Sequence, residues 1–182
     1  MPTRSNTSQL YVLRHAKSSW DDPVLEDHDR PLAPRGRRAA ALIAEHLRRE
    51  GIGPALILCS SALRARETLS RAVQSGTPAE VRIERNLYAA SAAELIERLR
   101  RVPPATRSVM LIGHNPALQT LVCTLAEHEG TRGQASAGGL LAAAQGKFPT
   151  GALATLALAC RWRELGPGSA ELTGFVRPRD LE

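Results

Sequence analysis

The sequence predicts one α/β domain, built on a mostly parallel sheet with helices on both faces. Short apolar runs suited to buried strands alternate with segments whose apolar residues recur at helical spacing, which is the pattern of βαβ units. The chain has 182 residues, and domains commonly hold about 100 to 200 residues. That length is enough for one sizeable core and short for two, so we expect a single domain over residues 1–182.

The first elements are a strand, a long loop, a helix and a second strand. Residues 9–13 form an apolar run suited to a strand buried on both faces. A polar loop punctuated by prolines follows over residues 16–34. Residues 35–50 then carry apolar side chains at helical spacing, and Gly51 ends this helix. Residues 55–58 predict the second buried strand.

The middle of the chain continues the alternation. Ser60 or Ser61 is expected to cap a helix that runs to about residue 74. Residues 81–83 predict a third strand. A helix over residues 91–101 follows, with a serine at its start and a glutamate three residues later in the capping-box positions.

The last third predicts three more strands. Residues 108–112 predict another buried strand. Asn115 is expected to cap a helix that has Pro116 in its first turn. Residues 130–149, which are rich in Gly, Ala and Gln, indicate an insertion or a mobile loop. The apolar runs at 151–159 and 172–176 predict the closing strands.

Arginine supplies nearly all of the positive charge, because Lys17 and Lys147 are the only lysines in a chain of net charge +6. The arginines are scattered, and the chain has only six aromatic residues. Nucleic-acid binding usually needs a focused basic patch, with aromatic platforms for single strands. We therefore expect no nucleic-acid partner, and favour the base composition of a GC-rich genome as the source of the arginine bias.

Cysteine usage and apolar lengths indicate a cytoplasmic protein. The three cysteines are far apart and form no CxxC pair, so neither a disulfide framework nor a zinc site is expected. Cys59 ends a buried strand and is expected to be a small core residue rather than a nucleophile. No apolar stretch reaches the length of a membrane span or of a signal-peptide core.

Three short strings begin where predicted strands end. They contain Arg14 with His15, Arg64, and His114. Because ligands of open α/β sheets bind beyond the carboxyl ends of the strands, these side chains are expected to share one pocket. Each residue taken alone also has a purely structural interpretation. Arg64 could belong to a solvated helix face, and His114 could lie in a turn and form a hydrogen bond with the backbone. Their common position at strand ends favours one site.

Two guanidiniums and two imidazoles in one pocket fit a phosphoryl group. A histidine that attacks phosphorus must be unprotonated, and neighbouring arginines lower its pKa. Arg14 and Arg64 would hold the anionic oxygens, with Arg64 beside the free N–H groups of a helix start. His114 would add a donor. Guanidiniums supply the charge neutralisation that phosphoryl transfer needs, so no metal or other cofactor is expected.

The chain resembles the histidine phosphatase superfamily, whose fold is phosphoglycerate-mutase-like. The resemblance rests on Leu-Arg-His-Ala at residues 13–16, Ser-Ser-Ala-Leu-Arg-Ala-Arg-Glu-Thr at 60–68 and Gly-His-Asn-Pro at 113–116. Asp-His-Asp-Arg-Pro-Leu at 27–32, Pro-Arg-Gly at 34–36 and Lys-Phe-Pro-Thr-Gly-Ala at 147–152 are most similar to its SixA-type phosphohistidine phosphatase branch. The resemblance covers nearly the whole chain.

The resemblance implies a three-layer α/β/α sandwich and a covalent mechanism. His15 would attack phosphorus and form a phosphohistidine enzyme, while Arg14, Arg64 and His114 would make the phosphate pocket. The substrate implied is phosphohistidine on a signalling protein, such as a histidine phosphotransfer domain.

Two positions depart from the family pattern. Ala16 replaces the usual glycine after the first histidine, and is small enough for the pocket to survive. Asn115 stands where some phosphatase branches have an aspartic acid that donates a proton. Mutase-like members use a glutamate instead, and neither Glu84 nor Glu94 matches it. The general acid is therefore unassigned. A phosphohistidine substrate reduces the need for one, because imidazole is a good leaving group.

Further residues are candidates for the pocket rim. Arg30 and Asp29 either reach the rim or form a surface salt bridge that ties down the loop. Lys17, Ser18 and Lys147 are weaker rim candidates. Two other functions use the same residues. One is a phosphoprotein-binding module without turnover, and the other is a small-molecule phosphomonoesterase or mutase, which would need an acid and an inserted cap.

Overall fold

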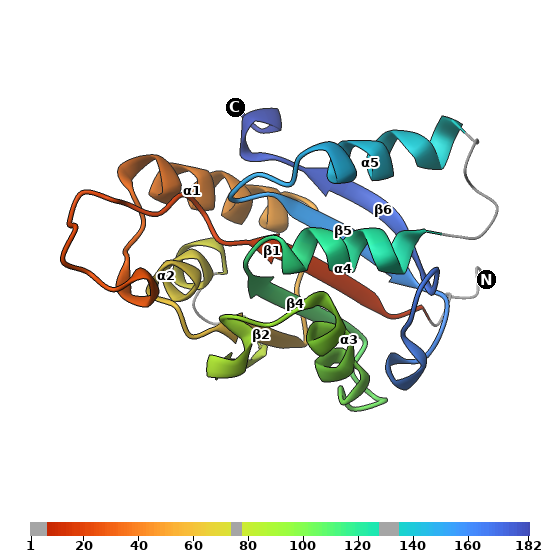
Figure 1. The fold of residues 1–182 in the computed structure, drawn as a ribbon. Helices are drawn as coiled ribbons and strands as arrows, with labels where there is room; N and C mark the ends of the chain where they lie inside the picture. The colour runs from red at the N-terminus through yellow and green to blue at the C-terminus, as the bar shows by residue number, and fades with distance from the viewer. Residues whose placement is uncertain (1–6, 74–77, 128–134) are drawn as a thin grey trace.

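A computed structural model describes residues 7–73, 78–127 and 135–182. Its centre is a six-stranded sheet in the order β3-β2-β4-β1-β5-β6 (Figure 1). The strands are β1 (Gln9–Arg14), β2 (Leu56–Ser60), β3 (Glu80–Glu84), β4 (Ser108–Gly113), β5 (Leu153–Leu158) and β6 (Ala170–Val176). The first four are parallel to one another, and β5 is antiparallel to both of its neighbours, β1 and β6. The mostly parallel sheet is therefore confirmed.

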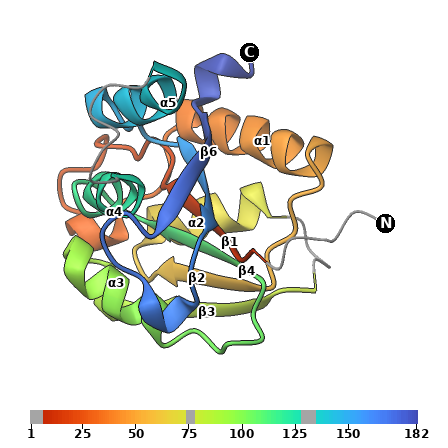
Figure 2. The same ribbon diagram turned by 90° about the vertical axis from the view of Figure 1, so that its right-hand side faces the viewer.

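Helices cover both faces of this sheet, which confirms the three-layer arrangement (Figures 1 and 2). One face carries α1 (Pro34–Arg49) and α2 (Leu63–Ala72). The other carries α3 (Ala92–Arg100), α4 (Ala117–Ala126) and α5 (Ala135–Gly146). Among the described residues, no helix is long and apolar enough to cross a membrane.

The unbroken apolar runs arise because the central strands are buried on both faces. Successive side chains of a strand point to opposite faces, so Ile57 packs with the α1 and α2 layer while Leu58 packs with the α3 and α4 layer. Cys59 is a fully buried core residue, as expected, and burial raises the pKa of its thiol to about 12. A thiol with that pKa is a poor nucleophile.

Two expected helix caps are wrong, because tertiary contacts take the side chains. The N-cap of α2 is Ala62, with no side-chain cap, while the Ser60 hydroxyl lies 2.7 Å from His114 Nε2. Helix α4 begins one residue after Pro116, which is its N-cap, and Asn115 Nδ2 donates to the Phe148 carbonyl at 3.1 Å. The capping box at the start of α3 is confirmed.

The expected loop over residues 130–149 is wrong over residues 135–146, where α5 forms. Residues 130–134 lie outside the described part of the chain. The composition of α5 includes many alanines, the residue with the highest helix propensity, and this outweighs its glycines. Gln119 of α4 donates to the carbonyls of Ala144 and Gln145 at 2.8 Å each, so α4 fixes the end of α5.

The long loop after β1 is held against α1 and α2. A Cβ on Gly36 would lie 2.1 Å from the Lys17 carbonyl, so glycine is required where α1 meets the loop. The backbone N–H groups of Ala16 and Leu32 donate to Thr68 Oγ1 and to Glu67 Oε2, both on α2. The loop is thereby fixed at the carboxyl end of the sheet.

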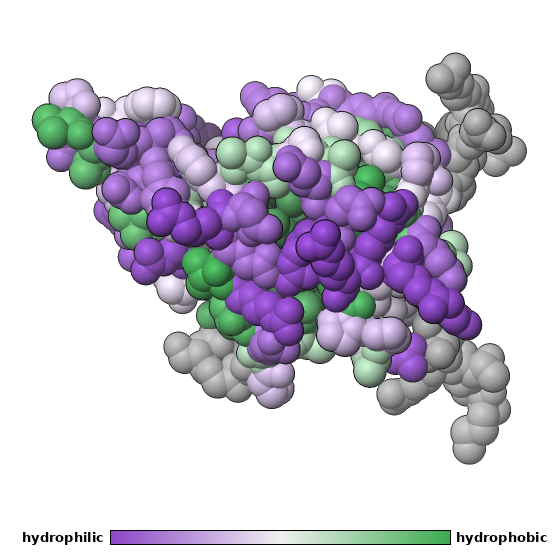
Figure 3. Space-filling view, turned by 60° about the horizontal axis from the view of Figure 1, so that its bottom comes forward, coloured by the Kyte–Doolittle hydropathy of each residue, from purple (hydrophilic) through white to green (hydrophobic). Residues whose placement is uncertain are grey.

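The face in Figure 3 is mostly hydrophilic, with hydrophobic residues in small separate groups. Two exposed apolar residues of the described chain, Val81 and Ile83, belong to edge strand β3. Singly exposed apolar residues are normal on soluble proteins.

Candidate active site

The carboxyl ends of β1, β2 and β4 bring four cationic or titratable side chains together. Strand β1 ends at Arg14, and the N–H of His15 then donates to the Gly113 carbonyl at the end of β4. The rings of His15 and His114 lie with their centroids 5.0 Å apart. Arg64 comes from the first turn of α2 and lowers the pKa of both histidines by charge repulsion. The structure thus unites the four residues expected to form one pocket.

His15 is held with one ring nitrogen free. Its Nδ1 lies 2.8 Å from the Ala16 carbonyl, which accepts only a hydrogen, so we assign the ring proton to Nδ1 and leave Nε2 with its lone pair. The side chain is 7% exposed. Burial, together with His114, Arg64 and Arg14, lowers the pKa of His15 to about 3. The imidazole is therefore neutral at pH 7, the state in which Nε2 can attack phosphorus.

Arg14 and Arg64 are oriented by fixed acceptors. Arg14 Nη1 donates to the Phe148 carbonyl at 2.8 Å. Arg64 donates through Nη1 to the Asp27 carbonyl and through Nη2 to the Asp27 carboxylate, the latter at 3.0 Å. The Nε atoms of both arginines and Nδ1 of His114 are buried and have no hydrogen-bond partner among the described residues. Such unpaired groups are rare in proteins, and their concentration in one pocket is typical of an anion site.

His114 is positioned by Ser60. The Ser60 hydroxyl accepts from the N–H of Ala62 at 3.3 Å and can donate its own hydrogen to His114 Nε2. With the Ser60 hydroxyl as the donor to Nε2, we assign the proton of His114 to the unpaired Nδ1, which is then a donor. Burial and the nearby arginines lower the pKa of His114 to about 4, so it donates as a neutral imidazole at pH 7.

Asp27 is a site residue that the sequence analysis missed. Its carboxylate accepts from Arg64, Arg30 and the Tyr88 hydroxyl. The bond from Tyr88 and the two guanidiniums hold the pKa of Asp27 well below its usual range. Tyr88 also packs edge-on against His114, with centroids 5.5 Å apart. The signal was within reach, because Asp27 opens the Asp-His-Asp-Arg-Pro-Leu string.

The rim candidates have different positions. Arg30 is buried and donates to Asp27 and, at 2.9 Å, to Ser18 Oγ, with its guanidinium 3.5 Å above the Trp20 ring. Asp29 pairs with His28 at 2.8 Å, so the carboxylate partner of Arg30 is Asp27. His28 in turn lies 2.9 Å from Ser61 Oγ.

Both lysines of the chain, Lys17 and Lys147, line a groove beside Arg14. They are exposed, whereas Ser18 is buried and supports the loop.

The carboxylates considered as general acids are bound elsewhere. Glu84 receives hydrogen bonds from the Arg98 guanidinium at 2.6 and 2.8 Å. Glu94 completes the capping box of α3, and Asp29 pairs with His28. The Asp27 carboxylate forms an ion pair with Arg64, but the lowered pKa of Asp27 keeps this carboxylate ionised. None of these four is set to protonate a leaving group at neutral pH.

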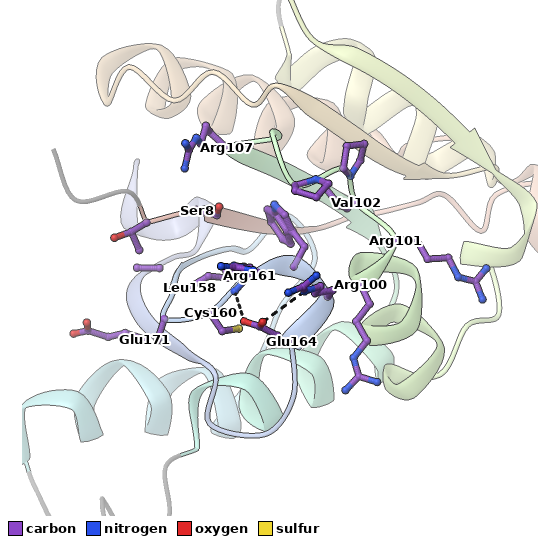
Figure 4. Close-up of a pocket in the computed structure, with 17 residues that line it drawn as sticks. Ser8, Arg100, Arg101, Val102, Arg107, Leu158, Cys160, Arg161, Glu164 and Glu171 are labelled. Atoms are coloured by element: carbon purple, nitrogen blue, oxygen red, sulfur yellow. Dashed lines mark hydrogen bonds and ion pairs between the residues drawn. The ribbon is translucent and has the colours of Figure 1, made fainter.

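A separate pocket, of about 1050 Å³, lies at the opposite end of the sheet (Figure 4). Its lining includes Ser8 before β1 and Arg107 before β4, and hence the amino ends of parallel strands. Ligands of α/β sheets bind at the other end. Glu164, which lines this pocket, is paired with Arg163 at 3.6 Å. Because of its position, we do not assign the active site to this pocket.

The lowered histidine pKa values predict an unusual pH profile. An unperturbed nucleophilic imidazole would lose activity below about pH 6.5. Because His15 and His114 have pKa values of about 3 and about 4, the neutral ring persists to that range. We expect kcat/KM, corrected for substrate ionisation, to stay level from pH 7 to about pH 5, with circular dichroism to verify folding. A tenfold loss per pH unit starting at 6.5 would contradict this assignment.

Known proteins with related sequences and structures identify the family of this chain. Residues 10–92 match the histidine phosphatase superfamily (branch 1). An uncharacterised protein of Mycobacterium tuberculosis is 38% identical over 92% of this chain and 100% of its own. A structure named as a candidate phosphohistidine phosphatase SixA from Nakamurella multipartitia is 29% identical, with a TM-score of 0.81 over 94% of this chain and 96% of that one.

A second such structure, the candidate SixA of Agrobacterium tumefaciens, is 28% identical, with a TM-score of 0.76 over 94% of this chain and 98% of that one. The phosphoglycerate-mutase-like fold is thereby confirmed. The chain is a phosphatase that belongs to the histidine phosphatase superfamily, in its SixA-type branch.

Proposed function

We propose that this phosphatase hydrolyses phosphohistidine on a signalling protein by way of a phosphohistidine formed on its own His15. Nε2 of His15 attacks phosphorus, and the bond from phosphorus to the substrate imidazole breaks. The substrate ring, which carries a proton from solvent on its other nitrogen, departs as neutral imidazole. Water then attacks the phosphorus on His15, the new P–N bond breaks, inorganic phosphate leaves and His15 returns to its neutral form.

The observation that carries this proposal is the state of His15. Its Nδ1 is bound to the Ala16 carbonyl and its pKa is about 3, so Nε2 is an unprotonated nucleophile at neutral pH. Arg14 and Arg64 flank it with buried, unpaired Nε donors, and His114 adds Nδ1. Donors of this kind stabilise the charge on phosphoryl oxygens. A nucleophile with this environment favours turnover over a binding module.

The choice of phosphohistidine rests on the leaving group. An alkoxide needs a general acid, whereas a phosphohistidine ring protonated on its other nitrogen leaves readily as neutral imidazole, whose conjugate acid has a reference pKa of about 6.5. The carboxylates near the pocket are ionised or bound to other groups. The two SixA-named structures are described as candidate phosphohistidine phosphatases, which supports the same choice.

The proposal is tested by a substrate screen. Phosphohistidine-containing proteins and peptides are compared with phosphosugars and nucleotides by kcat/KM. We expect phosphohistidine to be the preferred class. A phosphosugar or a nucleotide that is hydrolysed more efficiently would make the enzyme a small-molecule phosphomonoesterase instead.

Turnover is expected to be independent of divalent metals. The guanidiniums of Arg14 and Arg64 supply the positive charge that magnesium supplies in kinases. The described residues also contain no group of three or more His, Cys, Asp or Glu side chains placed to hold a metal ion. Dialysis against EDTA should leave kcat unchanged. A loss of activity that added magnesium or zinc restores would overturn this expectation.

A further inference from the structure

A groove of about 550 Å³ runs beside the catalytic pocket and shares Arg14 with it. Its walls are the first turns of α1, the segment 147–150 that follows α5, and the C-terminal segment 177–182. Figure 2 shows the C-terminal segment beside α1, which it contacts through Pro178–Asp180. The groove therefore continues from the phosphate pocket along one side of the molecule. We call it the basic groove.

The basic groove collects more positive charge than the carboxylates in and beside it balance. Both lysines of the chain line it, together with Arg35 and Arg38 of α1. These four side chains are exposed, and none makes an ion pair or a hydrogen bond with the residues that the structure describes. Elsewhere, some arginines pair with neighbouring glutamates, as Arg82 does with Glu80 and Arg100 with Glu97. Four cations without a partner among the described residues thus share the groove that Arg14 lines.

Acidic groups in the groove are few. Asp180 receives hydrogen bonds from Arg177 at 2.8 and 3.0 Å and lies 3.9 Å from Arg179, so it is already neutralised. Glu182 is the only carboxylate residue that lines the groove among the described residues. The field of the groove is therefore positive along its length, and it extends the field of the phosphate pocket.

We propose that the basic groove binds an acidic segment of the protein substrate, next to the phosphorylated histidine. This inference rests on the proposed function and adds the sequence context that the enzyme selects. Five of the seven cations of the groove, Lys17, Arg35, Arg38, Lys147 and Arg179, belong to exposed side chains, and Arg14 also flanks His15. Exposed and spread cations of this kind complement a run of carboxylates, whereas a second phosphate of a small molecule is usually held by buried donors.

The test compares two synthetic peptides that carry one phosphohistidine. One has glutamates at the flanking positions, and the other has glutamines there. At low salt we expect the wild-type enzyme to show a kcat/KM about tenfold higher for the glutamate peptide, because a charged groove raises the association rate. This preference should disappear at about 0.5 M salt, where the Debye length is only a few ångströms. Equal values for the two peptides at low salt would overturn the proposal.

Charge reversal on α1 localises the effect. In the double variant Arg35→Glu with Arg38→Glu, the preference for the glutamate peptide should fall to one or below. The matched control, Arg48→Glu with Arg49→Glu, changes the net charge equally at the other end of the same helix and should keep the preference. Helix content by circular dichroism verifies both variants. A preference retained by the first variant, or lost from both, would show that the groove is not the determinant.

Two further measurements distinguish a failure of the proposed function from a failure of the groove proposal. If neither peptide is dephosphorylated while p-nitrophenyl phosphate is, the proposed function fails. Fluorescence anisotropy with the unphosphorylated peptides then still tests the groove proposal. The glutamate peptide should bind the wild-type protein more tightly than it binds the Arg35→Glu, Arg38→Glu variant. If tripolyphosphate, but not the glutamate peptide, inhibits wild type more strongly than that variant, the groove serves a small polyanion and the acidic-segment assignment is wrong.

Discussion

Replacing His15 with alanine should abolish turnover while anion binding partly survives. The change removes Nε2, the attacking atom, but leaves Arg14, Arg64 and His114 with their unpaired donors. Loss of the nucleophile in enzymes with covalent intermediates costs a factor of about 10⁴ to 10⁶ in kcat. We therefore expect His15→Ala to lose at least about 10⁴-fold in kcat, and to retain measurable binding of vanadate or tungstate by calorimetry.

His46→Ala provides the matched control. His46 is half-buried on α1 and contacts Arg49, away from the pocket, so this variant should keep full activity. In the wild-type enzyme, a rapid quench with labelled substrate should also trap acid-labile phosphate on His15. Purified His15→Ala with near-normal hydrolysis would disprove the covalent scheme.

The second large effect concerns the leaving group. General acids typically contribute about a hundredfold or more, and each 1.4 kcal/mol of missing assistance is about tenfold in rate. Because Glu84, Glu94 and Asp29 are bound to other groups, an alkyl phosphate receives no such help from them. We expect kcat/KM for p-nitrophenyl phosphate to exceed that for ethyl phosphate at least about a hundredfold, and phosphohistidine to resemble the aryl ester.

The comparison uses kcat/KM because it reports formation of the phosphoenzyme, whereas the later hydrolysis is common to all substrates. Glu84→Gln and Glu94→Gln should leave the ratio of the two esters unchanged. Equal kcat/KM values, with chemistry rate-limiting, would mean that a general acid exists. Asp27 would then be the first residue to replace with asparagine, because it is the carboxylate that lies on Arg64.

The sheet and the four pocket residues were accessible from sequence because local pattern determines them. Strands buried on both faces read as continuous apolar runs, so the ends of β1, β2 and β4 were marked to within about two residues. Arg14, His15 and His114 lie directly at those ends, and Arg64 follows in the first turn of the next helix. The parallel arrangement then brought them to one edge.

The features that sequence analysis missed depend on contacts between distant segments. Asp27 opens the string at residues 27–32, but its role depends on contacts with distant residues such as Tyr88, which is 61 positions away. Ser60 and Asn115 have the right residue types for helix caps, but His114 and the Phe148 carbonyl engage them instead. Helix α5 was missed because glycine and alanine favour opposite structures and composition alone does not rank them.

The position of Asp27 sets the ionic valence that the pocket accepts. Both imidazoles are neutral at pH 7, the guanidiniums of Arg64 and Arg30 pair with the single carboxylate of Asp27, and Arg14 adds a third positive charge. The remaining charge is two positive units, which a phosphoryl dianion neutralises completely. A phosphodiester, with one negative charge, would leave a surplus in a poorly solvated site, where unbalanced charge is costly. Asp27 thereby matches the pocket to terminal phosphoryl groups and against bridging ones.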